Sequence, residues 1–344
     1  MTYLLYKRPM LHRVLLLALS LLLTGSLLCS CSPSSKPIEP SEQDLMVVAT
    51  CDGYDIYYEE LRYVAIAYRE QMAADYGEDI WTNPEKTATY LPMLKAKIED
   101  SLTINCGILS ICKDFNIDYQ EKAIQKSVQQ MIDDTVADVG GRKNYIQLLE
   151  ELHMTDHFIR YTLATDLCET ELLYVLTDLE LVIKSEKDFL PYALDDANFC
   201  ATYHMFVSKD AGDNMEENRA RAERIRQMIL DGTPIKDLIG SSENDDIYST
   251  GTPYHFTRGE YEEPYEEAAF ALEIGELSGV VECESGFYII ERQPLSEEYI
   301  TANLTELLKR YQYAEVELLI AEQRKQMSIE WTEYGAALDL LTLQ

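Results

Sequence analysis

The sequence predicts a multidomain protein, mainly α-helical towards both ends of the chain, with a smaller α+β domain between the helical parts. Three observations support this class. Stretches with apolar residues at helical spacing lie before residue 196, short β-rich runs alternate with short helical segments over residues 196–294, and a long amphipathic stretch follows. A chain of 344 residues, 47% of them hydrophobic, is long enough to bury two or three cores.

The first 31 residues have the pattern of a bacterial lipoprotein signal peptide. A basic region precedes the apolar run Val14–Leu23, which is too short to span a bilayer comfortably. The motif LCSC follows at residues 28–31, and the small Ser30 before Cys31 matches a lipobox. We expect Cys31 to be lipidated and residues 32–45 to form a flexible Ser/Pro-rich tether. The alternative is an ordinary secretory signal or an N-terminal membrane helix.

The charge balance argues against some partners. The chain has 29 Lys and Arg against 61 Asp and Glu, which gives a formal net charge of −32. Such a chain is repelled by nucleic acid and by anionic lipid headgroups. We therefore expect no nucleic-acid partner, and contact with the membrane only through the lipid anchor.

Cysteine and histidine spacing indicates no metal or redox centre. No two cysteines are spaced C-x-x-C, which argues against a zinc ribbon and a thioredoxin-like motif. His153 and His157 are four residues apart, but no glutamate completes H-E-x-x-H. We expect no metal and no cofactor. Export would permit disulfides, but one sequence leaves open the pairing among six cysteines: Cys51, Cys106, Cys112, Cys168, Cys200 and Cys283.

Residues 46–195 are predicted to be mainly helical. They open with two short β-rich runs joined at Asp52-Gly53, a pair that suits a tight hairpin because glycine tolerates positive φ. Thr155 is placed to cap the start of an amphipathic helix. Helical spacing covers three long stretches: 86–114, 119–139 and 155–183.

Residues 196–294 carry the most specific pattern of the chain. "ATYHMFV" is β-rich, "NMEENRARAERIRQMILDG" and "EEPYEEAAFAL" are helical, and "GVVEC" and "GFYIIER" read as strands. The pieces "YHMFV", "FTRGEYEEPYEEAAFAL", "GELSGVVE" and "SGFYII" together resemble a parvulin-type (rotamase) peptidyl-prolyl isomerase domain. With the hairpin, the helices and the lipobox, the whole chain resembles the PrsA/SurA-type extracytoplasmic foldase lipoproteins.

That resemblance implies how the rest of the chain is organised. In such proteins the segment after the isomerase folds back onto the N-terminal helices. Residues 46–195 and 295–344 are therefore expected to form one chaperone domain, with the α+β isomerase domain 196–294 inserted between them. The C-terminal part is predicted to begin with one long helix from Ser296 to Met327, followed by the strand-like "SIEW".

The resemblance also implies a polar site beneath a twisting X–Pro bond. The C–N bond resists rotation because of its partial double-bond character, and catalysis needs an environment that favours the twisted amide. His204 falls on the first of two family histidines, and Tyr288 stands where the second is expected. The acid or cysteine position falls around Asn244, with Asp245 adjacent.

A cup for the proline ring is implied in the same way. Tyr261 falls on the family's methionine position and Tyr265 on its phenylalanine position, with Phe256 nearby. Met205 follows the first histidine position and is assigned to substrate binding. Two tyrosines keep a flat face for proline, although each hydroxyl then needs a partner.

Two functions follow from the sequence. The first is a membrane-anchored foldase on the extracytoplasmic face of a bacterial cell membrane, an enzyme that isomerises X–Pro segments and clasps unfolded or nascent exported polypeptides. The alternative is a catalytically degenerate holdase of the same architecture, because Tyr288 replaces a histidine. A metal- or solute-binding lipoprotein lacks a ligand cluster in the sequence. The prediction leaves a homodimer open.

Overall fold

The computed structural model describes residues 39–344, except 210–214 and 242–251. The lipidation site predicted at Cys31 and the catalytic positions predicted at Asn244 and Asp245 lie outside the described residues. Within the described part of the chain, none of the helices combines the length and the apolar composition that crossing a bilayer requires.

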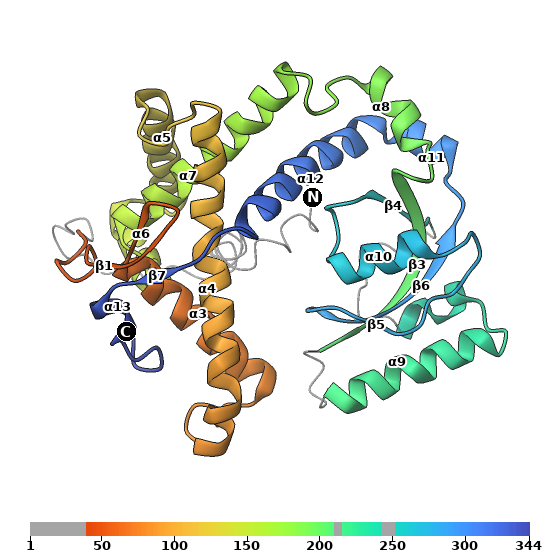
Figure 1. Ribbon diagram of the computed structural model, residues 1–344, viewed down its shortest axis with the longest axis horizontal. Helices are drawn as coiled ribbons and strands as arrows, with labels where there is room; N and C mark the ends of the chain where they lie inside the picture. Colours follow the sequence, from red (N-terminus) through yellow and green to blue (C-terminus); the bar gives the residue numbers. More distant parts are fainter. Residues whose placement is uncertain (1–38, 210–214, 242–251) are drawn as a thin grey trace. The chain divides into compact units, whose positions relative to one another are not determined.

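The described residues form two compact units, each with its own hydrophobic core (Figure 1). The helical unit contains the residues up to Val175 together with Leu319–Gln344, and the sheet unit contains Leu176–Leu318. The sheet unit is wider than the range 196–294 predicted for the α+β domain, because helices before and after that range pack with it. Of the segment predicted to fold back on the N-terminal helices, residues 319–344 belong to the helical unit.

The helical unit begins with the hairpin expected at Asp52-Gly53. Both residues have positive φ, 49° and 78°, and they join two short antiparallel strands. The unit's strands and helices are β1 (Val47–Cys51), β2 (Tyr54–Tyr57), α3 (Tyr58–Tyr76), α4 (Pro84–Asp114), α5 (Lys122–Asp138), α6 (Arg142–Glu151), α7 (Asp156–Asp178) up to Val175, the end of α12 (Leu304–Arg324), β7 (Glu330–Trp331) and α13 (Glu333–Ala336).

The C-terminal strand completes the small sheet of the helical unit. The strand order is β2-β1-β7, and Ala49 pairs antiparallel with Trp331. Gly335 lies so close to β1 that a Cβ placed on it would come within 1.9 Å of the Val48 carbonyl oxygen. The pairing therefore joins the two ends of the described chain in one unit.

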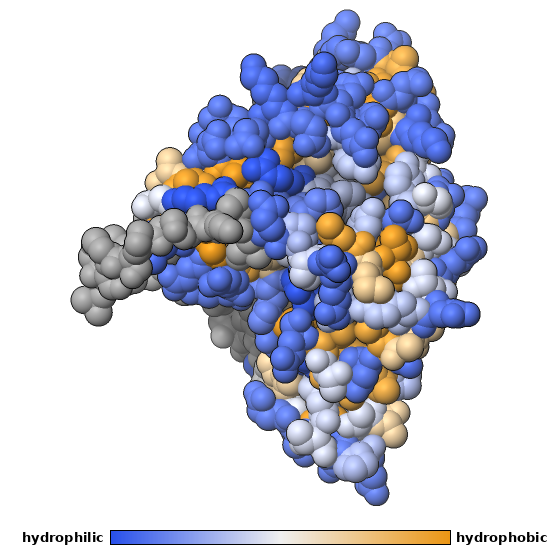
Figure 2. All heavy atoms as spheres, turned by 90° about the vertical axis from the view of Figure 1, so that its left-hand side faces the viewer, coloured by the Kyte–Doolittle hydropathy of each residue, from blue (hydrophilic) through white to orange (hydrophobic). Residues whose placement is uncertain are grey.

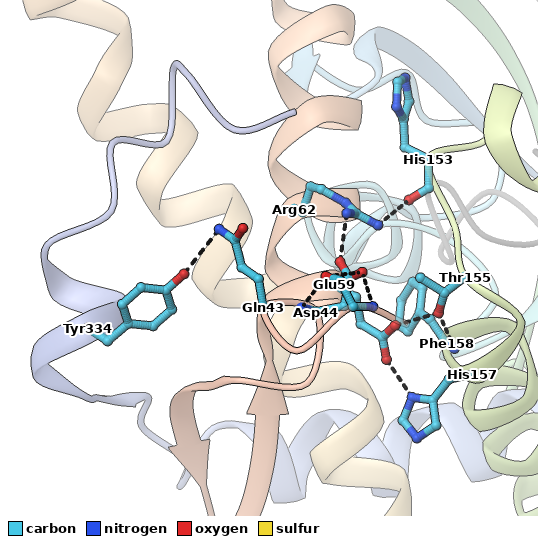
Figure 3. Close-up of polar contacts among 10 residues, drawn as sticks. Gln43, Asp44, Glu59, Arg62, His153, Thr155, His157, Phe158 and Tyr334 are labelled. Carbon is cyan, nitrogen blue, oxygen red and sulfur yellow. Dashed lines mark hydrogen bonds and ion pairs between the residues drawn. The ribbon is translucent and has the colours of Figure 1, made fainter. Parts of the chain in front are cut away.

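A buried carboxylate connects α3 to the start of α7 (Figure 3). Glu59 accepts one hydrogen bond from the hydroxyl of Thr155. The same hydroxyl oxygen caps α7 as expected, because it accepts from the Phe158 amide at 3.0 Å. His157 Nδ1 lies 2.5 Å from the other Glu59 oxygen, and this bond raises the pKa of His157. Figure 3 shows His153 pointing away from His157, so the two rings do not converge on one point.

The sheet unit is built around one strand that is almost completely buried. Its four-stranded antiparallel sheet has the order β4-β3-β6-β5, with β3 between β4 and β6. Nine of the ten residues of β3 are buried, as a central strand covered on both faces requires. The elements of the sheet unit are α8 (Glu186–Ala193), β3 (Phe199–Ser208), α9 (Met215–Leu230), η1 (Ile235–Ser241), β4 (Tyr254–Thr257), α10 (Glu263–Ala271), β5 (Val281–Glu282), β6 (Gly286–Gln293), α11 (Glu297–Ala302) and the first part of α12 (Leu304–Arg324).

The single helix predicted from Ser296 to Met327 is wrong. The structure has two helices, α11 and α12, separated at Asn303. The Asn303 side chain donates a 2.8 Å hydrogen bond to the carbonyl oxygen of Tyr299. Its own carbonyl oxygen accepts hydrogen bonds from the amides of Glu306 and Leu307 in the first turn of α12. Asparagine competes in this way for backbone groups, which ends one helix and begins the next.

Candidate active site

The candidate site is centred on His204, in the middle of β3. Its side chain is completely buried, and burial lowers the pKa of the imidazole to about 3. The imidazole is therefore neutral at physiological pH. Its Nδ1 lies 2.8 Å from the hydroxyl of Tyr265 on α10, and the same hydroxyl lies 2.8 Å from Oγ1 of Thr202. Thr202 and His204 are two residues apart on a strand, so both face α10.

Four tyrosines surround the imidazole, and we call them the tyrosine cluster: Tyr254, Tyr261, Tyr265 and Tyr288. Tyr254 stacks on His204 with 4.3 Å between ring centroids and 16° between planes. The other three meet the imidazole edge-on, at centroid distances from 5.2 to 6.4 Å. Aromatic rings favour such edge contacts, which fix the orientation of the imidazole.

Tyr288, which stands at the second histidine position, is held by its own polar contacts. It lies on β6 opposite Phe206, on the same side of the sheet as His204. The Tyr288 hydroxyl is 3.2 Å from Oγ of Ser285, and the Ser285 hydroxyl donates a hydrogen bond to the carboxylate of Glu262. The tyrosine thus takes part in a hydrogen-bond chain to a carboxylate. Unlike a histidine, it offers no cationic form there.

The four residues predicted to form the proline cup are all buried. Phe256 and Tyr265 are 0% exposed and Tyr261 is 4% exposed, so the structure shows no open cup at these rings. The ring of Tyr261 stacks on that of Tyr265 with 4.6 Å between ring centroids, and the ring centroids of Phe256 and Tyr261 are 4.7 Å apart. Met205 is adjacent to His204 on a strand, so it faces the opposite side of the sheet and does not line the tyrosine cluster. A proline ring can reach the cluster only if one of its side chains moves.

A network of carboxylates shapes the turn that carries Tyr261. Glu266 accepts from the amides of Gly259 and Tyr261 at 2.9 and 2.7 Å. Glu260 accepts from the amide of Thr257 at 2.8 Å and forms an ion pair with Arg310 of α12. Arg310 is held in addition by the carbonyl oxygen of His255, at 3.0 Å. The first part of α12 therefore supports the site.

Sequence reasoning missed several of these groups. The alternation on β3 could have placed Thr202 beside His204. Nothing in the spacing of Tyr254 indicated that its ring would stack on the imidazole. The roles of Glu260 and Glu266 depend on a folded turn, so their spacing gave no signal. Within the described ranges, no group of three or more His, Cys, Asp and Glu side chains is arranged to hold a metal ion.

Tyr265→Phe is expected to destabilise the sheet unit by about 1–3 kcal/mol. The substitution removes the hydroxyl that His204 and Thr202 share, and leaves both in a buried site without it. The measurement is denaturant unfolding, followed by hydrogen exchange of β3 and β6 peptides. Tyr313→Phe is the matched control, because that side chain is 42% exposed and its loss should change stability by less than about 0.5 kcal/mol. Equal effects of the two changes would contradict the network.

The sheet unit is expected to lose stability on acidification because of His204. The folded-state pKa of His204 is about 3 and the unfolded value is 6.5, so the unfolded chain binds the extra proton between these values. Stability is fully present above pH 6.5 and falls as the pH falls towards 3. By pH 5 the loss should reach about 2 kcal/mol. His255, whose pKa is also lowered by burial, acts in the same direction.

The pH effect can be measured separately in each unit. Hydrogen exchange of β3 and β6 peptides follows the sheet unit. Fluorescence follows the helical unit, which contains both tryptophans of the chain, Trp81 and Trp331. His204→Gln should remove most of the acid sensitivity of the sheet unit. Unchanged acid sensitivity in a folded His204→Gln variant would assign the effect to other groups.

Comparison with known proteins shows what the domain that carries these residues is similar to. Residues 196–293 match the family described as the PPIC-type PPIASE domain. Over 79 residues the chain is 42% identical to peptidyl-prolyl cis-trans isomerase pin1 of Schizosaccharomyces pombe, a match over 22% of this chain and 45% of that relative's length. The sheet unit thus contains a domain that is similar to the parvulin-type peptidyl-prolyl isomerases, and the chain spans about 45% of the length of this curated relative.

A second relative matches beyond this domain. The chain is 22% identical over 292 residues to foldase protein PrsA of Caldanaerobacter subterraneus subsp. tengcongensis, a match over 83% of this chain and 84% of the relative. The chain is therefore similar to a PrsA foldase over most of its length. Similar solved structures include PrsA from Bacillus anthracis, with a TM-score of 0.35 and 15% identity over 65% of this chain and 94% of that one. PrsA from Streptococcus pneumoniae has a TM-score of 0.34 and 17% identity over 81% and 92%.

Proposed function

We propose that this chain is an exported, membrane-anchored foldase that isomerises X–Pro bonds in unfolded polypeptides and holds them in its helical unit. The match of residues 196–293 to the isomerase family, with His204 hydrogen-bonded at the centre of the domain, is the observation that carries the proposal. The lipobox at Cys31 supports the anchor. Residues 196–294 would be the catalytic domain, with 46–195 and 295–344 as the chaperone part.

The residues of the site suit an amide that loses conjugation. Rotation about the C–N bond removes charge separation between the carbonyl oxygen and the nitrogen. A site lined by neutral rings therefore favours the twisted amide over the planar, more dipolar form. The low pKa of His204 keeps its imidazole neutral, and the Tyr265 hydroxyl beside it is one neutral hydrogen-bonding group for the twisting amide. Entry of proline requires displacement of Tyr254 or Tyr261, which cover the imidazole.

The helical unit offers apolar contact area for an unfolded chain. Figure 2 looks onto the side of Figure 1 that carries β1, α5, α6 and α13, and shows apolar residues exposed between hydrophilic ones. Apolar residues scattered singly occur on most protein surfaces, whereas extended patches mark binding surfaces. The exposed large apolar residues of this unit include Leu45, Met46, Met93, Met131 and Tyr174.

A protease-coupled isomerisation assay tests the enzymatic part of the proposal. The full chain in a mild detergent should accelerate cis-to-trans conversion of an X–Pro peptide. His204→Ala should lower kcat/KM by about tenfold, equal to about 1.4 kcal/mol. Tyr265→Phe provides a second, less disruptive variant, and Tyr313→Phe should retain full activity. Activity of the unchanged chain no greater than that of a folded His204→Ala variant would rule out the enzyme.

The alternative is a holdase with the same architecture and no isomerase activity. Two observations favour it: Tyr288 replaces the second family histidine, and the predicted proline cup is closed. The holdase predicts suppression of aggregation of an unfolded client by the unchanged chain and by His204→Ala alike, with no isomerisation by either. Failure to suppress aggregation would exclude both the holdase and the chaperone part of the foldase.

A further inference from the structure

Two cysteines of the helical unit come together between the hairpin and α4. Cys51 is the last residue of β1 and Cys106 lies in α4, and each is 1% exposed. Ser110, one helical turn after Cys106, donates a 2.6 Å hydrogen bond to Asp52, the residue after Cys51. These contacts place the two thiols side by side, and a side-chain hydrogen bond joins them.

A second pair joins α4 to α7. Cys112 and Cys168 are both 0% exposed, and their thiols share a side-chain hydrogen bond. The rings of Tyr119 and Tyr161 are in edge-on contact, with 5.8 Å between their centroids. Tyr119 lies seven residues after Cys112, and Tyr161 lies seven residues before Cys168. Two chain segments that run in opposite directions bring residues together in this order, Cys112 with Cys168 and Tyr119 with Tyr161. The contact between the rings and the contact between the thiols therefore agree with each other.

The other two cysteines of the described chain have different surroundings. Cys200 directs its Sγ towards the carbonyl oxygen of Ala269, at 3.8 Å. Cys283 interacts with the backbone of Tyr265. Both lie in the core of the sheet unit, where their contacts are to backbone groups. They serve as an internal comparison for the paired cysteines.

We propose that Cys51 with Cys106, and Cys112 with Cys168, are two disulfide sites that tie β1 and α7 to α4. Buried reduced cysteines often act only as small apolar residues, but two separate thiol contacts in the helical unit go beyond that role. Each bridge would close a long loop of the chain, which stabilises the fold mainly by restricting the unfolded state. The proposal does not depend on the isomerase activity.

The oxidation proceeds by exchange with a small-molecule disulfide. One cysteine loses its proton and attacks a sulfur of the oxidant, which forms a mixed disulfide and releases one thiolate. The second cysteine loses its proton and attacks the mixed disulfide, which closes the protein bridge and releases the other thiolate. The two protein thiols lose two electrons in total, the oxidant disulfide gains them, and the two protons pass to the released thiolates.

Burial determines when this reaction can occur. Desolvation raises the pKa of the Cys106 thiol. The pKa of the Cys112 thiol is raised mainly by its hydrogen bond with Cys168 and also by desolvation. Few thiolates are therefore present in the folded chain, and the folded reduced protein should react slowly. We expect the bridges to form during folding, before the core of the helical unit closes, when oxidant is present.

Peptide mapping tests the pairing. The full chain in mild detergent is unfolded and reduced, then refolded with oxidised glutathione, alkylated in denaturant and digested without reductant. Mass spectrometry should find two linked peptide pairs, Cys51 with Cys106 and Cys112 with Cys168, and should find Cys200 and Cys283 alkylated. Alkylation of all four paired cysteines, or bridges between other partners, would overturn the proposal.

A stability measurement with matched variants provides a second test. The oxidised chain should show a Tm for the helical unit roughly 5–15 °C above that of the reduced chain, measured by tryptophan fluorescence. Cys51→Ala should keep only the bridge of Cys112 and lose roughly half of this shift. Cys200→Ala should keep the whole shift. An equal Tm of oxidised and reduced chains, or an equal loss in Cys51→Ala and Cys200→Ala, would show that these cysteines act only as buried apolar residues.

Discussion

Arg310→Met is expected to destabilise the sheet unit by about 3–5 kcal/mol. The change removes the guanidinium paired with Glu260, which is only 4% exposed, and leaves that carboxylate buried without its counter-charge. The turn that carries Tyr261 loses its support from α12 in the same step, so isomerase activity should fall with stability. Denaturant unfolding, followed by hydrogen exchange of β4 and α10 peptides, measures the effect.

Lys184→Met is the matched control for this change. Lys184 pairs with Asp178 in the same unit, but the two side chains are 65% and 72% exposed, and such a pair contributes at most about 1 kcal/mol. The double change Arg310→Met with Glu260→Gln should recover part of the loss, because no unpaired charge remains. Equal losses for Arg310→Met and Lys184→Met would show that the Glu260 pair is not the support we describe.

Gly286→Ala is expected to destabilise the sheet unit by about 3 kcal/mol and to lower isomerase activity. A Cβ at this position would lie 2.3 Å from the carbonyl oxygen of Val207 and 2.6 Å from the ring of Phe206. Backbone cannot yield as a flexible side chain does, so β3 and β6 must separate where they pair. Tyr288 lies two residues further along β6, and its position relative to His204 should shift.

Gly279→Ala is the comparison for the second change. Its Cβ would meet nothing within 4 Å and its φ is not positive, so its effect should stay within about 0.5 kcal/mol. Thermal unfolding of the two variants, with tryptophan fluorescence as a separate record of the helical unit, distinguishes local strain from general damage. A stable Gly286→Ala variant with full activity would contradict the close approach of the two strands.

Much of the secondary structure could be predicted because its signals are local. The Asp52-Gly53 hairpin follows from the positive φ that glycine tolerates, and the cap at Thr155 follows from its side-chain oxygen. The break at Asn303 was missed, since apolar spacing continued across it and only the folded hydrogen bond shows that the helix ends. Local patterns therefore predicted the elements better than their ends.

The candidate site was predictable in part. The resemblance placed His204 on the first family histidine position in the β-rich run "ATYHMFV", and the structure places it on the central strand β3, fully buried. It also placed Tyr265 in a cup for the proline ring, and the structure shows this side chain buried, with its hydroxyl hydrogen-bonded to His204. Whether a side chain is covered depends on neighbours from several elements, and Tyr254, which covers the imidazole, gave no signal of its own.

The sequence by itself determined the class of domain in residues 196–293, the position of His204 in it, and the strands and helices around it. Those features depend on short-range periodicity and on motifs that are continuous in the chain. Only the tertiary structure decided that Ala49 pairs with Trp331, that Glu260 pairs with Arg310, and which cysteine thiols meet. Such contacts join residues far apart in the sequence, and their geometry is set by the packing of whole elements, which no local pattern specifies.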